Sequence, residues 1–177
     1  MLLLTRRTIL KGALSVIALE LIGCGSSSRG GAFPSYNLRP LPLDNGILTL
    51  GFNQIFAIEL TAQQDMIVDA LVVSIIADQP VDIAGVEIRD ETTQTIGNSV
   101  LRFPFRPVYP LQLQIPVNQF IPAGKKKVFV IYADVISFGR ANNLQVTLLN
   151  ILATTPGLIV LPPLGAPILG PPKVSNA

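Results

Sequence analysis

The sequence predicts an all-β fold, a single antiparallel β-sandwich, and two observations carry this prediction. Several short segments alternate apolar and polar residues, which is the pattern of a strand with one buried face. Fifteen prolines and fourteen glycines lie among these segments without a repeat period. They are too many for a helical bundle and instead mark turns between strands.

Residues 1–23 have the layout of an export signal that is removed after translocation. Arg6, Arg7 and Lys11 form a cationic start, and residues 12–22 are an apolar run. A helix that crosses a bilayer core about 30 Å thick needs about twenty apolar residues, so this run is too short to span one.

The four residues "LIGC" that end the apolar run resemble the lipobox of bacterial lipoprotein signal peptides. The match covers all four positions, Leu21, Ile22, Gly23 and Cys24. The resemblance implies that the Cys24 thiol receives a diacylglycerol and that the chain is cut just before it. It thus implies an anchor in the inner or outer membrane of the cell envelope, with the protein facing the periplasm or the cell exterior. The alternative is a buried structural cysteine.

The segment "TRRTILK" around Arg6 and Arg7 resembles a twin-arginine export motif, with Ile9 in place of the usual phenylalanine. Glu20 lowers the hydrophobicity of the apolar run, which suits such a signal. The resemblance implies export of an already folded protein. Paired arginines also occur in ordinary secretory leaders, so general secretion is the alternative.

Residues 24–45 are rich in glycine, serine and proline, which predicts a linker between the lipidated cysteine and the folded domain. Without the leader, the chain carries ten basic and ten acidic side chains. This balance gives no cationic surface for nucleic acid and no polybasic patch for a membrane. We therefore expect a lipid, and not charge, to hold the protein at the bilayer.

Residues 46–161 contain the predicted strands of the sandwich. The clearest is "LQLQIPVN", with Leu111, Leu113, Ile115 and Val117 on one face. Two other segments alternate in the same way, with inward faces at Phe56, Ile58 and Leu60 and at Leu144, Val146 and Leu148.

Residues 66–77 and 127–138 are apolar on both faces over much of their length, which predicts central strands or strands whose outer face is also covered. In "IPAGKKKVFVIYADV", residues 121–135, a turn with glycine leads into a long alternating strand. This hairpin resembles those of immunoglobulin-like and fibronectin-like modules on bacterial surfaces, which implies an immunoglobulin-like sandwich. The disulfide and core tryptophan of antibody domains are absent from the chain.

Residues 157–161 predict a last strand, and residues 162–177 predict a proline-rich tail. Proline cannot donate a hydrogen bond to a sheet, so the tail is not expected to form a central strand. We expect an apolar strap across the sandwich. The alternative is an extended segment or a strand that is offered to another molecule.

The composition argues against an enzyme, a cofactor and a zinc site. The chain has no histidine and one cysteine, so His-based catalysis and the usual zinc ligands are excluded. Asp69 and Asp134 lie inside apolar strands, where we expect structural roles, and an acid-based enzyme is the alternative. A calcium site remains a further alternative, at Asp78 with Asp82 or at Asp90 with Glu91.

The segment "RFPFRPVY" is the candidate surface for a ligand or partner. If extended, it sets Phe103, Phe105 and Tyr109 on one side and Arg102 and Arg106 on the other. Aromatic and arginine side chains are enriched where interfaces bind most strongly. The alternative is a connection between the sheets whose aromatic rings enter the core.

Together these features predict a non-enzymatic, membrane-anchored envelope lipoprotein whose sandwich binds another protein or joins an assembly. One alternative is a binder of a small ligand or polysaccharide. Another is an accessory subunit of an exported enzyme complex. Nothing in the sequence identifies the partner.

Overall fold

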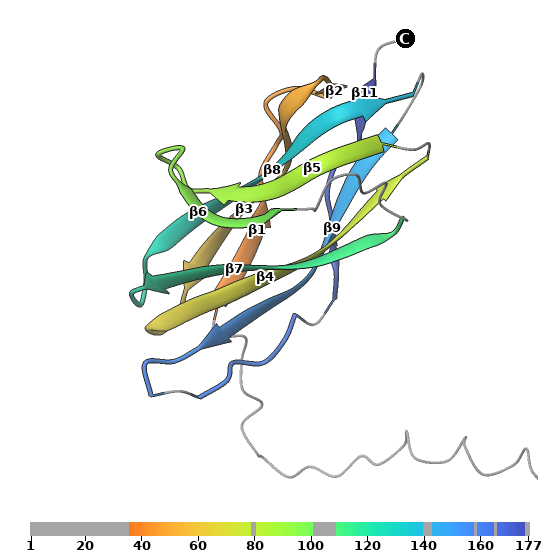
Figure 1. The fold of residues 1–177 in the computed structure, drawn as a ribbon. Helices are drawn as coiled ribbons and strands as arrows, with labels where there is room; N and C mark the ends of the chain where they lie inside the picture. The colour runs from red at the N-terminus through yellow and green to blue at the C-terminus, as the bar shows by residue number, and fades with distance from the viewer. Residues whose placement is uncertain are drawn as a thin grey trace, which may run out of the picture. The chain divides into compact units, whose positions relative to one another are not determined.

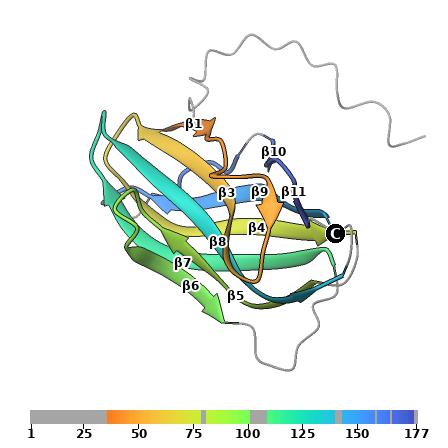
Figure 2. The same ribbon diagram turned by 90° about the horizontal axis from the view of Figure 1, so that it is seen from above.

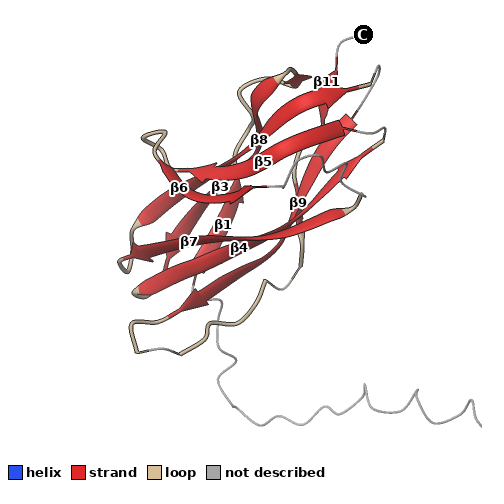
Figure 3. Cartoon of the chain, in the orientation of Figure 1, coloured by secondary structure: helices blue, strands red, loops and turns tan. Residues whose placement is uncertain are grey.

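A computed structural model describes residues 36–78, 81–100, 109–139, 143–157, 159–164 and 166–175. Within these residues the chain forms eleven strands and no helix (Figure 3). The strands are β1 (Tyr36–Pro40), β2 (Ile47–Leu48), β3 (Gly51–Ala62), β4 (Met66–Ala77), β5 (Val81–Arg89), β6 (Thr95–Val100), β7 (Leu111–Ile121), β8 (Lys126–Phe138), β9 (Asn143–Thr154), β10 (Ile168–Leu169) and β11 (Lys173–Ser175).

The strands form two sheets that pack face to face (Figure 1 and Figure 2). Sheet A has the order β1-β3-β8-β5-β6, and sheet B has the order β2-β11-β9-β4-β7, with β10 paired to β9. All pairs are antiparallel except β2 with β11. The predicted all-β sandwich is confirmed.

The two segments that are apolar on both faces are central strands, as predicted. Strand β4 lies between β9 and β7, and strand β8 lies between β3 and β5. A central strand has a neighbour on each side, so all its backbone groups can be paired while both faces exclude water.

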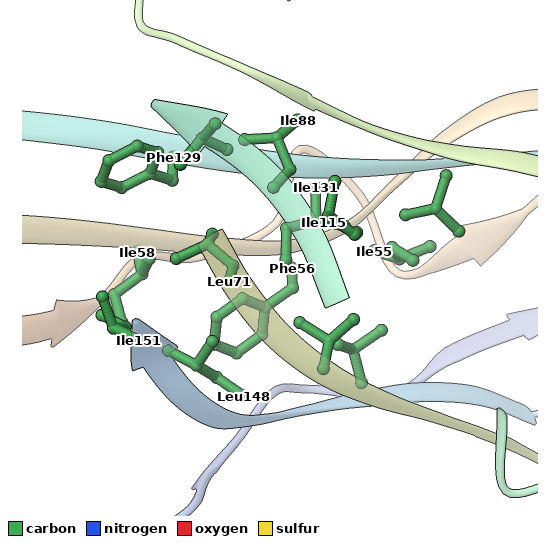
Figure 4. Close-up of a cluster of buried hydrophobic side chains, with 14 of the residues drawn as sticks. Ile55, Phe56, Ile58, Leu71, Ile88, Ile115, Phe129, Ile131, Leu148 and Ile151 are labelled. Atoms are coloured by element: carbon green, nitrogen blue, oxygen red, sulfur yellow. The ribbon is translucent and has the colours of Figure 1, made fainter. Parts of the chain in front are cut away.

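The core lies between the sheets and is made by the inward rows of the alternating strands. The predicted inward faces of β3 and β9 are buried, and β7 buries Ile115 and Val117 while Leu111 and Leu113 pack against the core. Figure 4 shows Phe56 of sheet A facing Leu71 and Leu148 of sheet B. Full burial of each such side chain contributes about 1.5–3 kcal/mol.

The central pairs of the sandwich agree with those of an immunoglobulin domain. If β3 to β9 are counted as strands A to G, the hydrogen-bonded pairs β4–β7 and β5–β8 are the B–E and C–F pairs. The strands counted as A, D and G lie on the opposite sheets from those of an antibody constant domain. The agreement is therefore one of central architecture.

Strands also form in the segments predicted to be linker and tail. Strand β1 lies in the predicted linker and pairs with β3 through residues 36–40. Strand β11 lies in the predicted tail and is held between β2 and β9. The described part of the predicted last strand, residues 157–161, forms one isolated bridge, in which Val160 pairs with Thr154 of β9. The C-terminal segment thus completes sheet B.

Candidate functional site

Of the residues predicted to serve export, lipidation or partner binding, the structure describes one. The export and lipidation residues Arg6, Arg7, Leu21, Ile22, Gly23 and Cys24 lie outside the described residues, as do Arg102, Phe103, Phe105 and Arg106. Tyr109 is described, and it lies just before β7.

Tyr109 joins the two sheets through its side-chain hydroxyl. The side chain is half-buried against the core, and its hydroxyl donates a hydrogen bond to the carbonyl oxygen of Val81, 2.8 Å away. Burial, and next the charge of Asp82, raise the pKa of the Tyr109 hydroxyl well above its usual range. This residue therefore agrees with the alternative in which aromatic rings of this segment enter the core.

A shallow hollow lies instead on the outer face of sheet A. Its volume is about 240 Å³, and it crosses β3, β8, β5 and β6. The residues that line it are Phe52, Asp134, residues 84–87 and residues 98–100. We call it the Gly85 hollow, after the residue at its floor.

The sheet register brings the lining residues together from distant parts of the chain. Phe52 pairs with Asp134, Asp134 pairs with Gly85, and Gly85 pairs with Val100. Residues directly opposite one another in antiparallel strands point to the same face. One row of residues across the four strands therefore consists of an aromatic ring, a carboxylate, a glycine and an aliphatic side chain, in the order Phe52, Asp134, Gly85 and Val100.

Gly85 leaves the middle of this row open. The register of β5 shifts between Ile83 and Gly85, so Ala84 bulges and both small residues line the outer face. A Cβ at position 85 would lie 3.2 Å from the carbonyl oxygen of Ser99, so even alanine would crowd the floor.

The rim of the Gly85 hollow is apolar and exposed. Phe52 is 55% exposed and Val100 is 77% exposed. Leu50 and Ile136 are also exposed. Leu50 precedes Phe52 by two residues, and Ile136 follows Asp134 by two residues. Exposed apolar side chains that gather around a depression mark surfaces that bind other molecules.

An arginine beside the hollow is bound to its own chain. Arg89 forms an ion pair with Glu87. Its guanidinium also lies over two rings, 4.4 Å from the centre of Tyr132 and 5.1 Å from the centre of Phe52. Asp134, which is half-buried, makes no hydrogen bond or ion pair with any other residue of the described ranges. The row therefore carries one uncompensated negative charge.

The other carboxylates singled out from the sequence lie elsewhere. Asp69 sits at the bulge of β4 on sheet B and is half-buried, so neither it nor Asp134 is enclosed in the core. Asp78 accepts a hydrogen bond from Asn143, and Asp82 accepts one from Ser137.

Asp90 closes the turn between β5 and β6. Its carboxylate accepts hydrogen bonds from the side chain and backbone of Thr92 and from the backbone of Gln94, and it pairs with Lys127 at 3.1 Å. The pKa of the Asp90 carboxyl lies far below its usual range, chiefly because the Thr92 side chain donates a hydrogen bond to it. Glu91 also pairs with Lys127. Among the described residues, no three Asp, Glu, His or Cys side chains gather as a metal site.

The comparisons with known proteins assign no family to this arrangement: the chain matches no protein-family model and no curated protein sequence. Within the described part of the chain, no helix has the length and apolar character that crossing a membrane requires.

Proposed function

We propose that this protein is a non-enzymatic lipoprotein of the cell envelope, anchored through Cys24, whose β-sandwich binds another protein. The observation that supports the binding role best is the Gly85 hollow with its exposed rim. An exposed aromatic side chain in an apolar patch, next to polar groups, is a usual composition of an interface hot spot.

The proposed anchor would keep this surface near the bilayer. Eleven residues separate Cys24 from Tyr36, the first residue of β1. Fully extended, that many residues span about 40 Å at most. A partner would therefore have to lie in, or close to, the same membrane.

Lipidation is tested by mass spectrometry of the full-length gene product purified from its own membranes. We expect a mature chain that begins at Cys24 and carries the mass of a diacylglycerol. The variant Cys24→Ser should remain unmodified and retain residues 1–23. An unmodified Cys24 thiol in the wild-type protein, with the leader still attached, would refute the proposed anchor.

The binding surface is tested by photo-cross-linking in native membranes. A photoreactive residue at Val100 should capture a defined protein partner. The same residue at Gln114, exposed on β7 of the other sheet, is the matched control and should capture none. Equal capture from both positions, or none from Val100, would refute this face as the interface.

Two further functions would use the same surface. Phe52, Asn98 and Asp134 all line the hollow, and together they resemble the stacking and hydrogen-bonding groups that a sugar ring uses, which favours a polysaccharide ligand as the second candidate. If the partner captured from Val100 were an enzyme exported with this chain, the protein would be its accessory subunit.

A further inference from the structure

We propose that the Gly85 hollow receives an arginine side chain of the partner protein. This inference rests on the proposed function, since it names the chemical group that the same surface would recognise. The recognition would combine the Asp134 carboxylate with the exposed ring of Phe52, over the open floor at Gly85.

The protein itself contains a version of this arrangement one row along the sheet. There, the Glu87 carboxylate pairs with Arg89, whose guanidinium also lies over the Tyr132 ring. Tyr132 and Glu87 are partners across β8 and β5, as Asp134 and Gly85 are in the next row. Asp134 and Phe52 repeat the combination of carboxylate and ring on neighbouring strands. Arg89 lies over the Phe52 ring, but no cation of the described residues pairs with Asp134.

Charge favours a cation at this place. Glu87 is compensated by Arg89, whereas Asp134 is half-buried and makes no ion pair within the described ranges. A carboxylate that is partly removed from water gains more from an opposite charge than one on an open surface, because the local dielectric constant is lower.

Shape favours arginine over lysine and over a larger ligand. A guanidinium is planar, stacks on aromatic rings and can donate two parallel hydrogen bonds to one carboxylate, whereas an ammonium is a compact point charge. The hollow of about 240 Å³ is smaller than the roughly 300–1,000 Å³ of small-molecule sites. It therefore suits one inserted side chain better than an oligosaccharide.

The test uses the full chain in detergent micelles, with methyl groups of valine labelled for NMR. The probes are the peptides acetyl-Gly-Arg-Gly-amide, its citrulline analogue, which has the same shape without charge, and its lysine analogue. We expect the arginine peptide to shift the Val100 methyl signals with a dissociation constant at least fivefold lower than that of citrulline. Lysine should fall between them.

Two variants locate the binding to the hollow. Asp134→Asn should raise the dissociation constant of the arginine peptide about fivefold, and Phe52→Leu should raise it about threefold. Asp69→Asn, which removes a half-buried strand carboxylate from the other sheet, is the matched control and should leave it unchanged. Equal affinity for arginine and citrulline, or equal loss in the two Asp variants, would overturn the inference.

The cross-linking test separates this inference from the proposed function. If Val100 captures a partner whose cross-linked segment contains no arginine, the binding surface stands and the arginine inference fails. If Val100 captures no protein while a neutral oligosaccharide shifts its methyl signals, both fail and the polysaccharide alternative replaces them.

Discussion

Lys173 is a buried lysine of β11, a strand within the segment that the sequence predicts to be a tail, and its replacement should test how the C-terminal segment is held. Its side chain is 1% exposed. Its ammonium contacts the carboxylate of Asp44 at 3.1 Å, the side-chain oxygen of Asn45 at 2.9 Å and the carbonyl oxygen of Ile47 at 3.4 Å. The lysine thereby ties β11 to the loop that leads into β2.

The expected cost has two parts, which two variants separate. Lys173→Met keeps a long apolar side chain and removes only the ammonium. Its three acceptors belong to exposed residues and can bind water again, and Asp44 is 51% exposed, so we expect a loss of about 1–2 kcal/mol. Lys173→Ala also removes about three buried methylene groups, at about 0.8 kcal/mol each, for a total loss of about 3.5–4.5 kcal/mol.

The assay is urea unfolding of the full chain followed by circular dichroism, with the free energy of unfolding extrapolated to water. Asp44→Asn is the control for the ion pair alone and should cost no more than about 1 kcal/mol, because its carboxylate is half-exposed. The reasoning fails if the free energy of unfolding of Lys173→Ala lies within 0.5 kcal/mol of the wild-type value. It also fails if the methionine variant loses as much stability as the alanine variant.

Three other perturbations have definite expected outcomes. Gly97→Ala should lower the free energy of unfolding by about 3 kcal/mol in the same assay, because its Cβ would clash with the Pro116 carbonyl oxygen. Gly46→Ala is the control: no atom lies within 4 Å of its Cβ, so its free energy of unfolding should stay within 0.5 kcal/mol of the wild type. Tyr109→Phe should cost about 1 kcal/mol at neutral pH. Because the folded pKa of Tyr109 is raised above its ordinary 10.0, wild-type stability should fall as pH rises beyond 10, and the phenylalanine variant should fall less steeply. The folded pKa of Asp90 is lowered from 3.8, so its contribution is full above that pH and lost on acidification, and Asp90→Asn should unfold with a flatter dependence on pH below 4.

The sequence predicted the long strands because burial leaves a direct mark on them. A strand with one buried face must alternate, as residues 111–117 do, and a strand with two covered faces must be apolar along most of its length, as residues 66–77 are. The short strands leave no such mark. Strand β11 has three residues and includes a lysine, so only its pairing with β2 and β9 reveals it.

The hollow could not be assembled from the sequence because its residues meet only through the register of four strands. Phe52 and Asp134 are far apart in the chain, and neither the pairing of β3 with β8 nor that of β5 with β8 follows from alternation alone. Asp134 stands out in the sequence because a carboxylate interrupts an apolar strand, whereas nothing in the sequence identifies its neighbours across the sheet.

One signal for the hollow was nevertheless present in the sequence of β5. In "VDIAGVEIR" the inward residues are Val81 and Ile83, and then Val86 and Ile88, so the spacing changes from two to three between Ile83 and Val86. A single step of three within a period of two requires an extra residue on the outer face, which is the definition of a bulge. Here the extra position falls on an alanine followed by a glycine, so the strand turns its two smallest side chains outward together. A large residue at either position would restore an ordinary outer face, and the floor on which the proposed arginine rests would be filled.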